Sequence, residues 1–509
     1  MNKGKLKWLK FIILALCLII VFIMVHMDNE NKAIDETYFM YAEVSGHRIN
    51  VFKSGEKYYL FLPSFLNEED IEYSFEARKH DIDVIKSDGL ASVFITTNSG
   101  SLDNIIADKN YKESGKIKVY DKNGSENISV GLDYMKGRGN YSWTNWDKKS
   151  FKIKLSKNKN FLDLGEGQDY ALIANASDAT LIRNHIAREL ECAVEIPFAS
   201  TGRFVDLYVN GDYMGNYYLC PSIEVGTDRV DITNIDEKQS LVYSRYNSEA
   251  FDVYETPLIK GWNLPEVVDD ITGGYLLERE FGDRYTLEYG DINNGFITDN
   301  EEHFIVIAPQ YCTKSEINYI SDFVNKAENE ILTGENLGQY INLESFAKRY
   351  LVEEVVKNYD GGVSSAYYYK DSDLVDSRFT AGPGWDFDMS LGNYLEWMDY
   401  ANQDATGITR LYTSEHSTNY FKQLLEYNSF NELVKEYFET SAYDYMEYMV
   451  AEGIDEYEDM LSASAYMDSI RWGQMYEEKG YSTADTTEYQ KLKQFIADRI
   501  EYLKGEWVN

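Results

Sequence analysis

The stretch GPGWDFDMSLGN, residues 382–393, holds the residues that decide the fold and function assignment of this chain. Asp386 and Asp388 stand two positions apart, with glycine and proline before them and Gly392 after them. Carboxylates that alternate in an extended loop can converge on a hard divalent cation such as Mg²⁺ or Mn²⁺, which prefers oxygen ligands. Such pairs also occur on ordinary solvated surfaces, so the pattern alone leaves both interpretations open.

A second polar segment, KNYDGG at 357–362, precedes this loop. It places Asn358 and Asp360 at the end of an apolar helix expected over 345–360, and Asp360 lies 26 residues (386 − 360) before Asp386. In phosphotransferases one Asp orients or deprotonates the acceptor hydroxyl, and a later Asp binds the metal that bridges the phosphates. The alternative is a helix end whose polar side chains are solvated.

Basic residues gather in two segments of a chain that has few of them. Arg138 lies in GRGN, Lys149, Lys152 and Lys154 follow in a predicted strand, and Arg183 stands in LIRN at the start of a predicted helix. Such a cluster can neutralise phosphate oxygens. Alternatively, each of these residues pairs with one of the 86 Asp and Glu residues.

The motifs taken in order resemble the spore coat protein H (CotH) kinase-like family, from roughly residue 125 to 395 and less strongly to the end of the chain. The sequences that carry the resemblance are MKGRGNYSW, KKSFKIKL, LIANASDATLIRN, VDLYVNGDYMGNYYL, GGYLLE, VKNYD and GPGWDFDMSLGN. The resemblance implies an α+β, atypical protein-kinase-like fold. It also implies that ATP and Mg²⁺ or Mn²⁺ are used to phosphorylate Ser or Thr of surface or secreted proteins.

Transferred residue by residue, the resemblance makes Asp360 the catalytic Asp and Asp386 a catalytic, metal-binding Asp. Asp388 and Asn358 are then expected as further metal ligands.

Arg138, Lys149, Lys154 and Arg183 fall in the family's basic motifs and are expected to contact the nucleotide phosphates. The chain departs from the family pattern in YMGNYYLCPSIEVG, where Pro221 stands in place of the usual Glu. If that Glu positions a lysine or a metal, its loss weakens nucleotide binding. Glu224 and Glu278, the latter in GGYLLE, are the two candidates to replace it.

Composition and missing motifs exclude several other functions. The 509 residues carry 49 Lys and Arg against 86 Asp and Glu, a formal charge of −37, which argues against binding to nucleic acid. The sequence contains no G-x-S-x-G motif, no P-loop and no clustered Cys or His of a zinc site.

The N-terminus predicts a membrane anchor. Four lysines lie within the first ten residues, an apolar run spans 11–25, and acids follow at 28–30, so we expect residues 8–27 to cross the cell membrane with the folded body outside. A cleaved signal peptide is the alternative, although no small-x-small site follows the run. The expected organisation is an anchor or signal sequence at 1–27, a small β-sandwich at 38–118, a CotH kinase-like core at 125–400 and a helical part at 401–509.

A second function class stays open beside the kinase. The acidic, Tyr-rich composition and Pro221 also fit a catalytically inactive cell-surface assembly or adhesion protein that keeps the fold.

Overall fold

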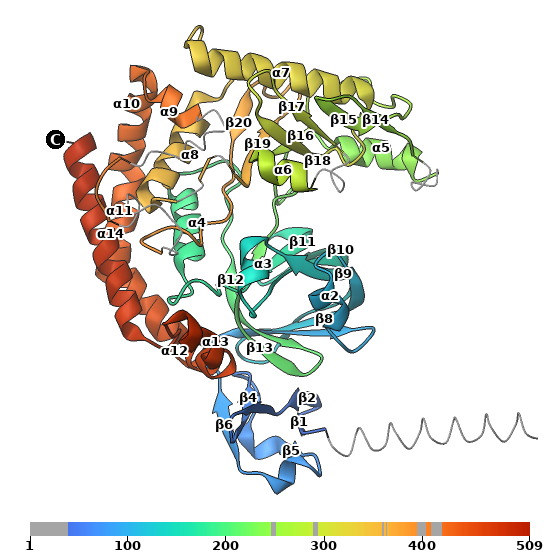
Figure 1. Ribbon diagram of the computed structural model, residues 1–509, viewed down its shortest axis with the longest axis vertical. Helices are drawn as coiled ribbons and strands as arrows, with labels where there is room; N and C mark the ends of the chain where they lie inside the picture. The colour runs from blue at the N-terminus through green and yellow to red at the C-terminus, as the bar shows by residue number, and fades with distance from the viewer. Residues whose placement is uncertain are drawn as a thin grey trace, which may run out of the picture.

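A computed structural model describes residues 39–245, 251–288, 294–358, 361–362, 364–393, 404–408 and 420–508. The predicted anchor and Asp360 lie outside these ranges. Within them, no helix is both long and apolar enough to cross a membrane. Helices and several sheets make up the chain (Figure 1), which confirms the α+β class.

The N-terminal unit consists of two three-stranded sheets that share one apolar cluster. The first contains β2 (His47–Asn50), β1 (Tyr41–Val44) and β5 (Ile71–Tyr73), and the second β3 (Phe52–Ser54), β4 (Lys57–Leu62) and β6 (Ile82–Lys86). Their cluster includes Tyr208 and Tyr213 of the next unit and Met467 of a C-terminal helix, so the N-terminal unit is packed onto the body of the protein.

A closed barrel follows, with strand order β10-β11-β13-β12-β7-β8-β9. Its strands are β7 (Ala91–Thr97), β8 (Glu113–Tyr120), β9 (Glu126–Arg138), β10 (Ser150–Asn160), β11 (Glu166–Ile173), β12 (Arg203–Val209) and β13 (Asp212–Pro221). The β12–β13 hairpin turns at Asn210 and Gly211, both with positive φ, as the Asn-Gly signal indicates. Short helices α2 (Asp103–Ala107) and α3 (Tyr141–Asn145) and the longer α4 (Arg183–Ala193) lie in its connections.

The expected boundary of the β-sandwich differs from the structure. Strands β7 and β8 fall inside 38–118 but belong to the barrel, because β7 pairs in parallel with β12 and β8 pairs with β9. Alternation along a strand shows which face is buried but not which strand it joins, and the partner of β7 comes more than a hundred residues later.

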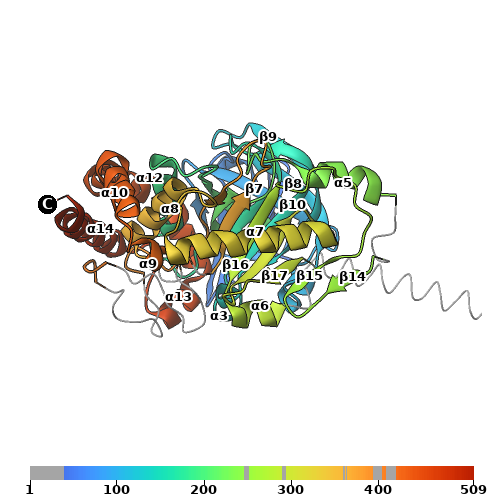
Figure 2. The same cartoon turned by 90° about the horizontal axis from the view of Figure 1, so that it is seen from above.

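Above the barrel lies a seven-stranded sheet of order β14-β15-β17-β18-β16-β19-β20. Its strands are β14 (Val253–Glu255), β15 (Ile259–Trp262), β16 (Tyr275–Glu280), β17 (Gly295–Ile297), β18 (His303–Ala308), β19 (Ala366–Lys370) and β20 (Phe379–Ala381). Helix α7 (Lys314–Thr333) crosses it (Figure 2), opening on the Thr313–Glu316 capping box and ending at Gly334. Helices α5 (Ile235–Tyr243) and α6 (Gly282–Glu288) flank the sheet, and α8 (Leu343–Val356) packs against β20.

The remaining helices form a C-terminal arm, which we define as residues 428–507. Its elements are α10 (Asn428–Tyr437), α11 (Tyr443–Tyr448), α12 (Ile454–Arg471), α13 (Gly473–Lys479) and α14 (Thr486–Trp507), with α9 (Tyr420–Leu424) just before it. The arm runs along one side of the molecule, from α8 beside the upper sheet to β13 of the barrel (Figure 1). It therefore links the two halves between which the candidate site lies.

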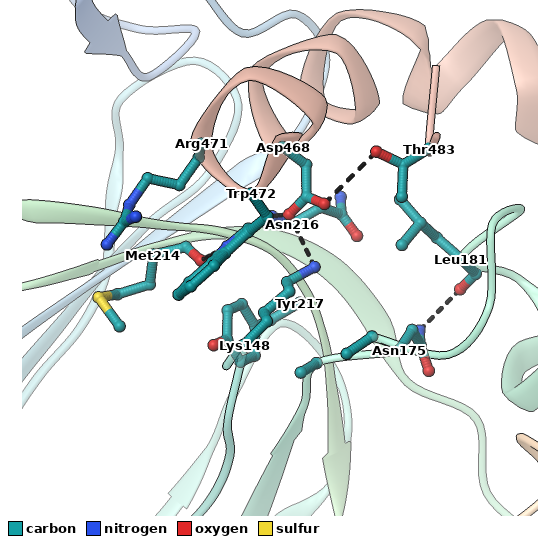
Figure 3. A network of polar contacts seen from close by, with 12 residues as sticks. Lys148, Asn175, Leu181, Met214, Asn216, Tyr217, Asp468, Arg471, Trp472 and Thr483 are labelled. Carbon is teal, nitrogen blue, oxygen red and sulfur yellow. Dashed lines mark hydrogen bonds and ion pairs between the residues drawn. The ribbon is translucent and has the colours of Figure 1, made fainter. Parts of the chain in front are cut away.

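A buried polar network joins the arm to the barrel (Figure 3). The Lys148 ammonium and the Asp468 carboxylate, both fully buried, lie 2.7 Å apart. Asp468 also accepts hydrogen bonds from the Asn216 backbone N–H at 2.9 Å and the Tyr476 hydroxyl at 2.6 Å. The Trp472 indole donates to the Met214 carbonyl at 2.8 Å.

Candidate active site

A cleft lies between the barrel and the upper sheet, and it contains two adjoining cavities. The inner cavity, about 480 Å³, is lined by the loop after β9, the 175–177 turn, and Trp385, Asp386 and Asp388. The second, about 560 Å³, is lined by five cationic side chains among the described residues, and we call it the basic cavity. Both share Arg138, Lys152, Glu278 and Arg284, so they form one continuous site.

The two aspartates of the inner cavity flank a buried anchor. Phe387 is fully buried, and its N–H donates to the Asn184 Oδ1 at 2.9 Å. Asp386 adopts the left-handed conformation, φ +67°, with an exposed side chain. Asp388 is partly buried and accepts a hydrogen bond from the Ser177 hydroxyl at 3.2 Å. Loop 382–393 thus presents both carboxylates to one cavity.

Burial raises the pKa of Asp388 to about 7, and the neighbouring charge of Asp386 adds to this effect. The hydrogen bond from Ser177 and the positive charge of Arg138 act in the opposite direction. A divalent cation stabilises the ionised form of a carboxylate whose pKa is raised by burial and by a neighbouring negative charge, as that of Asp388 is.

The donor set around the pair fits such a cation. Asn358 is 1% exposed; its amide nitrogen donates to the Asp386 carbonyl at 3.4 Å, while its Oδ1 has no hydrogen-bond partner in the described part of the chain. Asp386, Asp388 and this oxygen are all hard ligands. In the same part of the chain, no group of three or more His, Cys, Asp and Glu side chains gathers as a metal site.

Glycines on both sides allow Arg138 to reach the cleft. A Cβ at Gly137 would lie 2.5 Å from the Trp143 ring, and Gly139 has φ +90°. The Arg138 guanidinium lies 4.6 Å from the centre of the Trp385 ring, beside the aspartates. It forms no ion pair within the described ranges, so its charge is directed to the cavity.

The other residues that were predicted to contact phosphate do not line either cavity. Lys149 donates to the Trp143 carbonyl and lines neither cavity, and Lys154 lies 3.8 Å from Asp169, also outside both. Arg183 is buried, pairs with Asp178 and donates to the Leu391 carbonyl at 3.2 Å. It thereby holds the aspartate loop instead of lining the cleft.

Lys152, which belongs to the basic cluster but was not predicted as a ligand, lines both cavities and pairs with Asp169 at 2.8 Å. Strand alternation places Lys152 and Lys154 on the outer face of β10, and Lys149 lies before the strand begins. The alternation of side chains along β10 was the only sequence signal for which lysine lines the cleft, and it does not distinguish Lys152 from Lys154.

The family described as CotH kinase protein matches residues 135–503. The chain belongs to the CotH kinase protein family. The match begins within β9, so the N-terminal unit, β7 and β8 precede it. No similar protein was found among curated sequences.

In this CotH family member, the structure separates the two candidates for the Glu that Pro221 replaces. Glu278 of β16 lines the cleft and accepts the hydroxyl hydrogen of Tyr367. Glu224 faces away from the cleft, where it lies 3.5 Å from Arg229, and burial followed by the charge of Asp169 raises its pKa to about 7. Glu278 is therefore the carboxylate available to the site.

The aspartate loop of this family member is supported from two sides. Behind it, a Cβ at Gly384 would lie 1.5 Å from the Arg349 guanidinium, which pairs with buried Glu191 and Glu353. On the other side the Asn393 amide donates to the Ser177 carbonyl at 3.1 Å. The surrounding structure thus fixes the carboxylates before any ligand arrives.

Proposed function

We propose that this CotH family member transfers the γ-phosphoryl group of ATP to a Ser or Thr hydroxyl of a surface or secreted protein. The observation that supports this most is the Asp386–Asp388 pair facing Arg138 across one cavity. The family description, CotH kinase protein, supports the same class of reaction. The predicted anchor at residues 8–27 is the reason to place the acceptor outside the membrane.

The residues of the chain have separate tasks in this proposal. Asp386, Asp388 and Asn358 Oδ1 are the ligands we assign to Mg²⁺ or Mn²⁺, which when bound neutralises charge on the β- and γ-phosphates. Arg138 and Lys152 supply further positive charge to the phosphate oxygens.

Asp360, by its position in the family motif, accepts the proton of the acceptor hydroxyl. The hydroxyl oxygen forms the new P–O bond, and the bond from the γ-phosphorus to the bridging oxygen breaks, releasing ADP.

Replacement of Asp386 by Asn tests the proposal. We expect Asp386→Asn to abolish transfer of labelled phosphate from ATP to protein while the far-UV circular dichroism stays unchanged. Asp133→Asn is the matched control, because Asp133 lies exposed on β9 and lines neither cavity. Equal labelling by wild type and Asp386→Asn would refute the assignment.

A binding measurement distinguishes the kinase from the alternative, an inactive surface assembly or adhesion protein. For the inactive protein, binding to a partner or to the cell wall is expected to be the same with and without nucleotide and metal. Binding that requires both would exclude it.

A further inference from the structure

A buried triad of charges lies directly behind the aspartate loop. Arg349 of α8 pairs with Glu191 of α4, with 2.5 Å between Nη1 and Oε1, and with Glu353 one turn further along α8. All three side chains are at most 4% exposed. Burial raises the pKa of both glutamates, which reflects the cost of removing their charges from water. Because a buried ion pair is weak evidence for stability, the contacts of the triad are the better guide to its role.

One end of the triad contacts the aspartate loop. The backbone N–H of Gly384 donates to Glu191, and a Cβ at Gly384 would lie 2.0 Å from the Glu191 carboxylate and 1.5 Å from the Arg349 guanidinium. Only glycine therefore allows the loop backbone to lie this close to the pair. The Arg349 guanidinium also lies 5.4 Å from the centre of the ring of Phe387, the residue between the two aspartates. Glu191 and Arg349 thus hold the loop that carries both carboxylates.

The other end of the triad contacts Asn358. The Asn358 amide lowers the pKa of Glu353 by hydrogen bonding, although at standard distance and angle Glu353 Oε2 has no partner within the described ranges. Asn358 Nδ2 also donates to the Asp386 carbonyl at 3.4 Å. A carboxylate and a backbone carbonyl only accept hydrogen bonds, so both attract the N–H end of the amide. The Oδ1 end is then turned away from them, and in the described part of the chain it has no partner.

We propose that Glu353 is the positioning residue for the metal ligand Asn358, and that the triad aligns Asn358 with the aspartate loop. With its N–H end held toward Glu353, the amide offers the metal an oxygen, which a hard cation binds, and not an N–H donor. Arg349 joins Glu353 to Glu191, so one ion network holds the ligands of both segments. The inference rests on the proposed function, which assigns Asn358 and the two aspartates as ligands. The triad is absent from the described lining of both cavities, so it acts through these ligands.

Removal of the Glu353 charge tests this inference. Glu353→Gln keeps the size of the side chain, but the new amide can donate to Asn358 Oδ1, so this oxygen is no longer kept for the metal. Mn²⁺ is titrated into the full chain without nucleotide, and free Mn²⁺ is followed by electron paramagnetic resonance. We expect Glu353→Gln to bind Mn²⁺ about tenfold more weakly than the wild type, as is usual when a group that orients a metal ligand is lost.

Glu328→Gln is the matched control. Glu328 of α7 is as deeply buried as Glu353, accepts hydrogen bonds from Asn300 and Tyr420, and is outside the described lining of both cavities. The same substitution there is expected to leave the Mn²⁺ affinity unchanged.

A second substitution separates positioning from a general effect of charge or stability. Asn358→Ala removes the amide that Glu353 orients, so in that background we expect Glu353→Gln to cause no further loss of Mn²⁺ affinity. A purely structural or electrostatic role predicts the same factor of loss in both backgrounds. Arg349→Lys keeps the positive charge but cannot bridge two carboxylates, and it is expected to weaken Mn²⁺ binding as well. It serves as the test if far-UV circular dichroism shows that Glu353→Gln does not fold.

Two results would overturn the inference. One is an unchanged Mn²⁺ affinity in the folded variant, and the other is an equal factor of loss with and without the Asn358 amide. Phosphate transfer from labelled ATP is measured in parallel with the wild type. The expected pattern of Mn²⁺ affinities without any transfer would refute the kinase function while the positioning role stands. A wild type that binds no Mn²⁺ would refute the assigned ligands, and the positioning role with them.

Discussion

The buried ion pair between Lys148 and Asp468 allows a quantitative prediction, because it is one of the contacts that join the C-terminal arm to the barrel. Asp468→Asn keeps the shape of the side chain and an acceptor for the Asn216 N–H, but it removes the negative charge 2.7 Å from the Lys148 ammonium. Breaking one partner of a buried pair costs about 3–5 kcal/mol. The ammonium can escape the uncompensated burial by releasing its proton, which at pH 7 caps the loss near 4.6 kcal/mol.

The stability of Asp468→Asn is also expected to depend on pH. Burial already lowers the pKa of Lys148 in the wild type, where Asp468 opposes the shift. In Asp468→Asn the folded pKa lies still further below that of the unfolded chain, so the unfolded state binds more protons and stability rises with pH. The deficit relative to wild type is therefore expected to shrink by up to about 2.7 kcal/mol between pH 7 and pH 9.

Urea denaturation followed by tryptophan fluorescence measures these free energies, because the indole of Trp472 lies at the arm–barrel contact. The exposed pair Lys493–Asp455, 2.8 Å apart, is the matched control, and Asp455→Asn is expected to cost about 1 kcal/mol or less. A loss below about 1 kcal/mol for Asp468→Asn, or a deficit that does not change with pH, would refute the claim that this pair holds the arm.

Three further predictions concern the cleft. Arg138→Ala is expected to raise the Kd for MgATP about tenfold or more, because charge-assisted hydrogen bonds to phosphate are lost; calorimetry checks this, and an unchanged Kd would remove Arg138 from the site. Asp388, with its pKa raised to about 7, must lose a proton before it binds a cation, so Mn²⁺ affinity should rise with pH up to about 7 and level off above it. The raised pKa also stabilises the metal-free fold at acidic pH, a contribution lost as pH rises through 7. Comparison of the melting temperatures of wild type and Asp388→Asn at pH 5.5 and pH 8 tests this, and an equal difference at both values would contradict it.

The sequence predicts the centre of the site better than its surroundings. Its main features depend only on residues close together in the sequence: the spacing of Asp386 and Asp388, and the glycines on either side of Arg138. The structure places these three charged residues in the lining of one cavity. Lys149 and Arg183 have the right charge for phosphate contacts, but their hydrogen bonds go to Trp143 and Asp178. Only the tertiary fold decides which of two neighbouring cations turns toward a cleft.

Contacts between residues far apart in the sequence explain why other features of the fold could not be predicted. The boundary at 118–125 could not be placed from the sequence because β7 finds its parallel partner β12 far along the chain. The role of the arm was equally hidden, since Asp468 lies in a helix whose sequence gives no sign of its contact with Lys148. Pro221 in place of the usual Glu predicted weakened nucleotide binding. That Glu278 lines the cleft could be seen only in the folded chain.

Calorimetric titration of ATP into the protein, with and without Mg²⁺ or Mn²⁺, tests the central claim most directly. The proposed function predicts saturable binding that requires the metal and disappears in Asp386→Asn. Absence of binding up to millimolar ATP with either metal would contradict it and would favour an inactive surface protein that keeps the CotH fold.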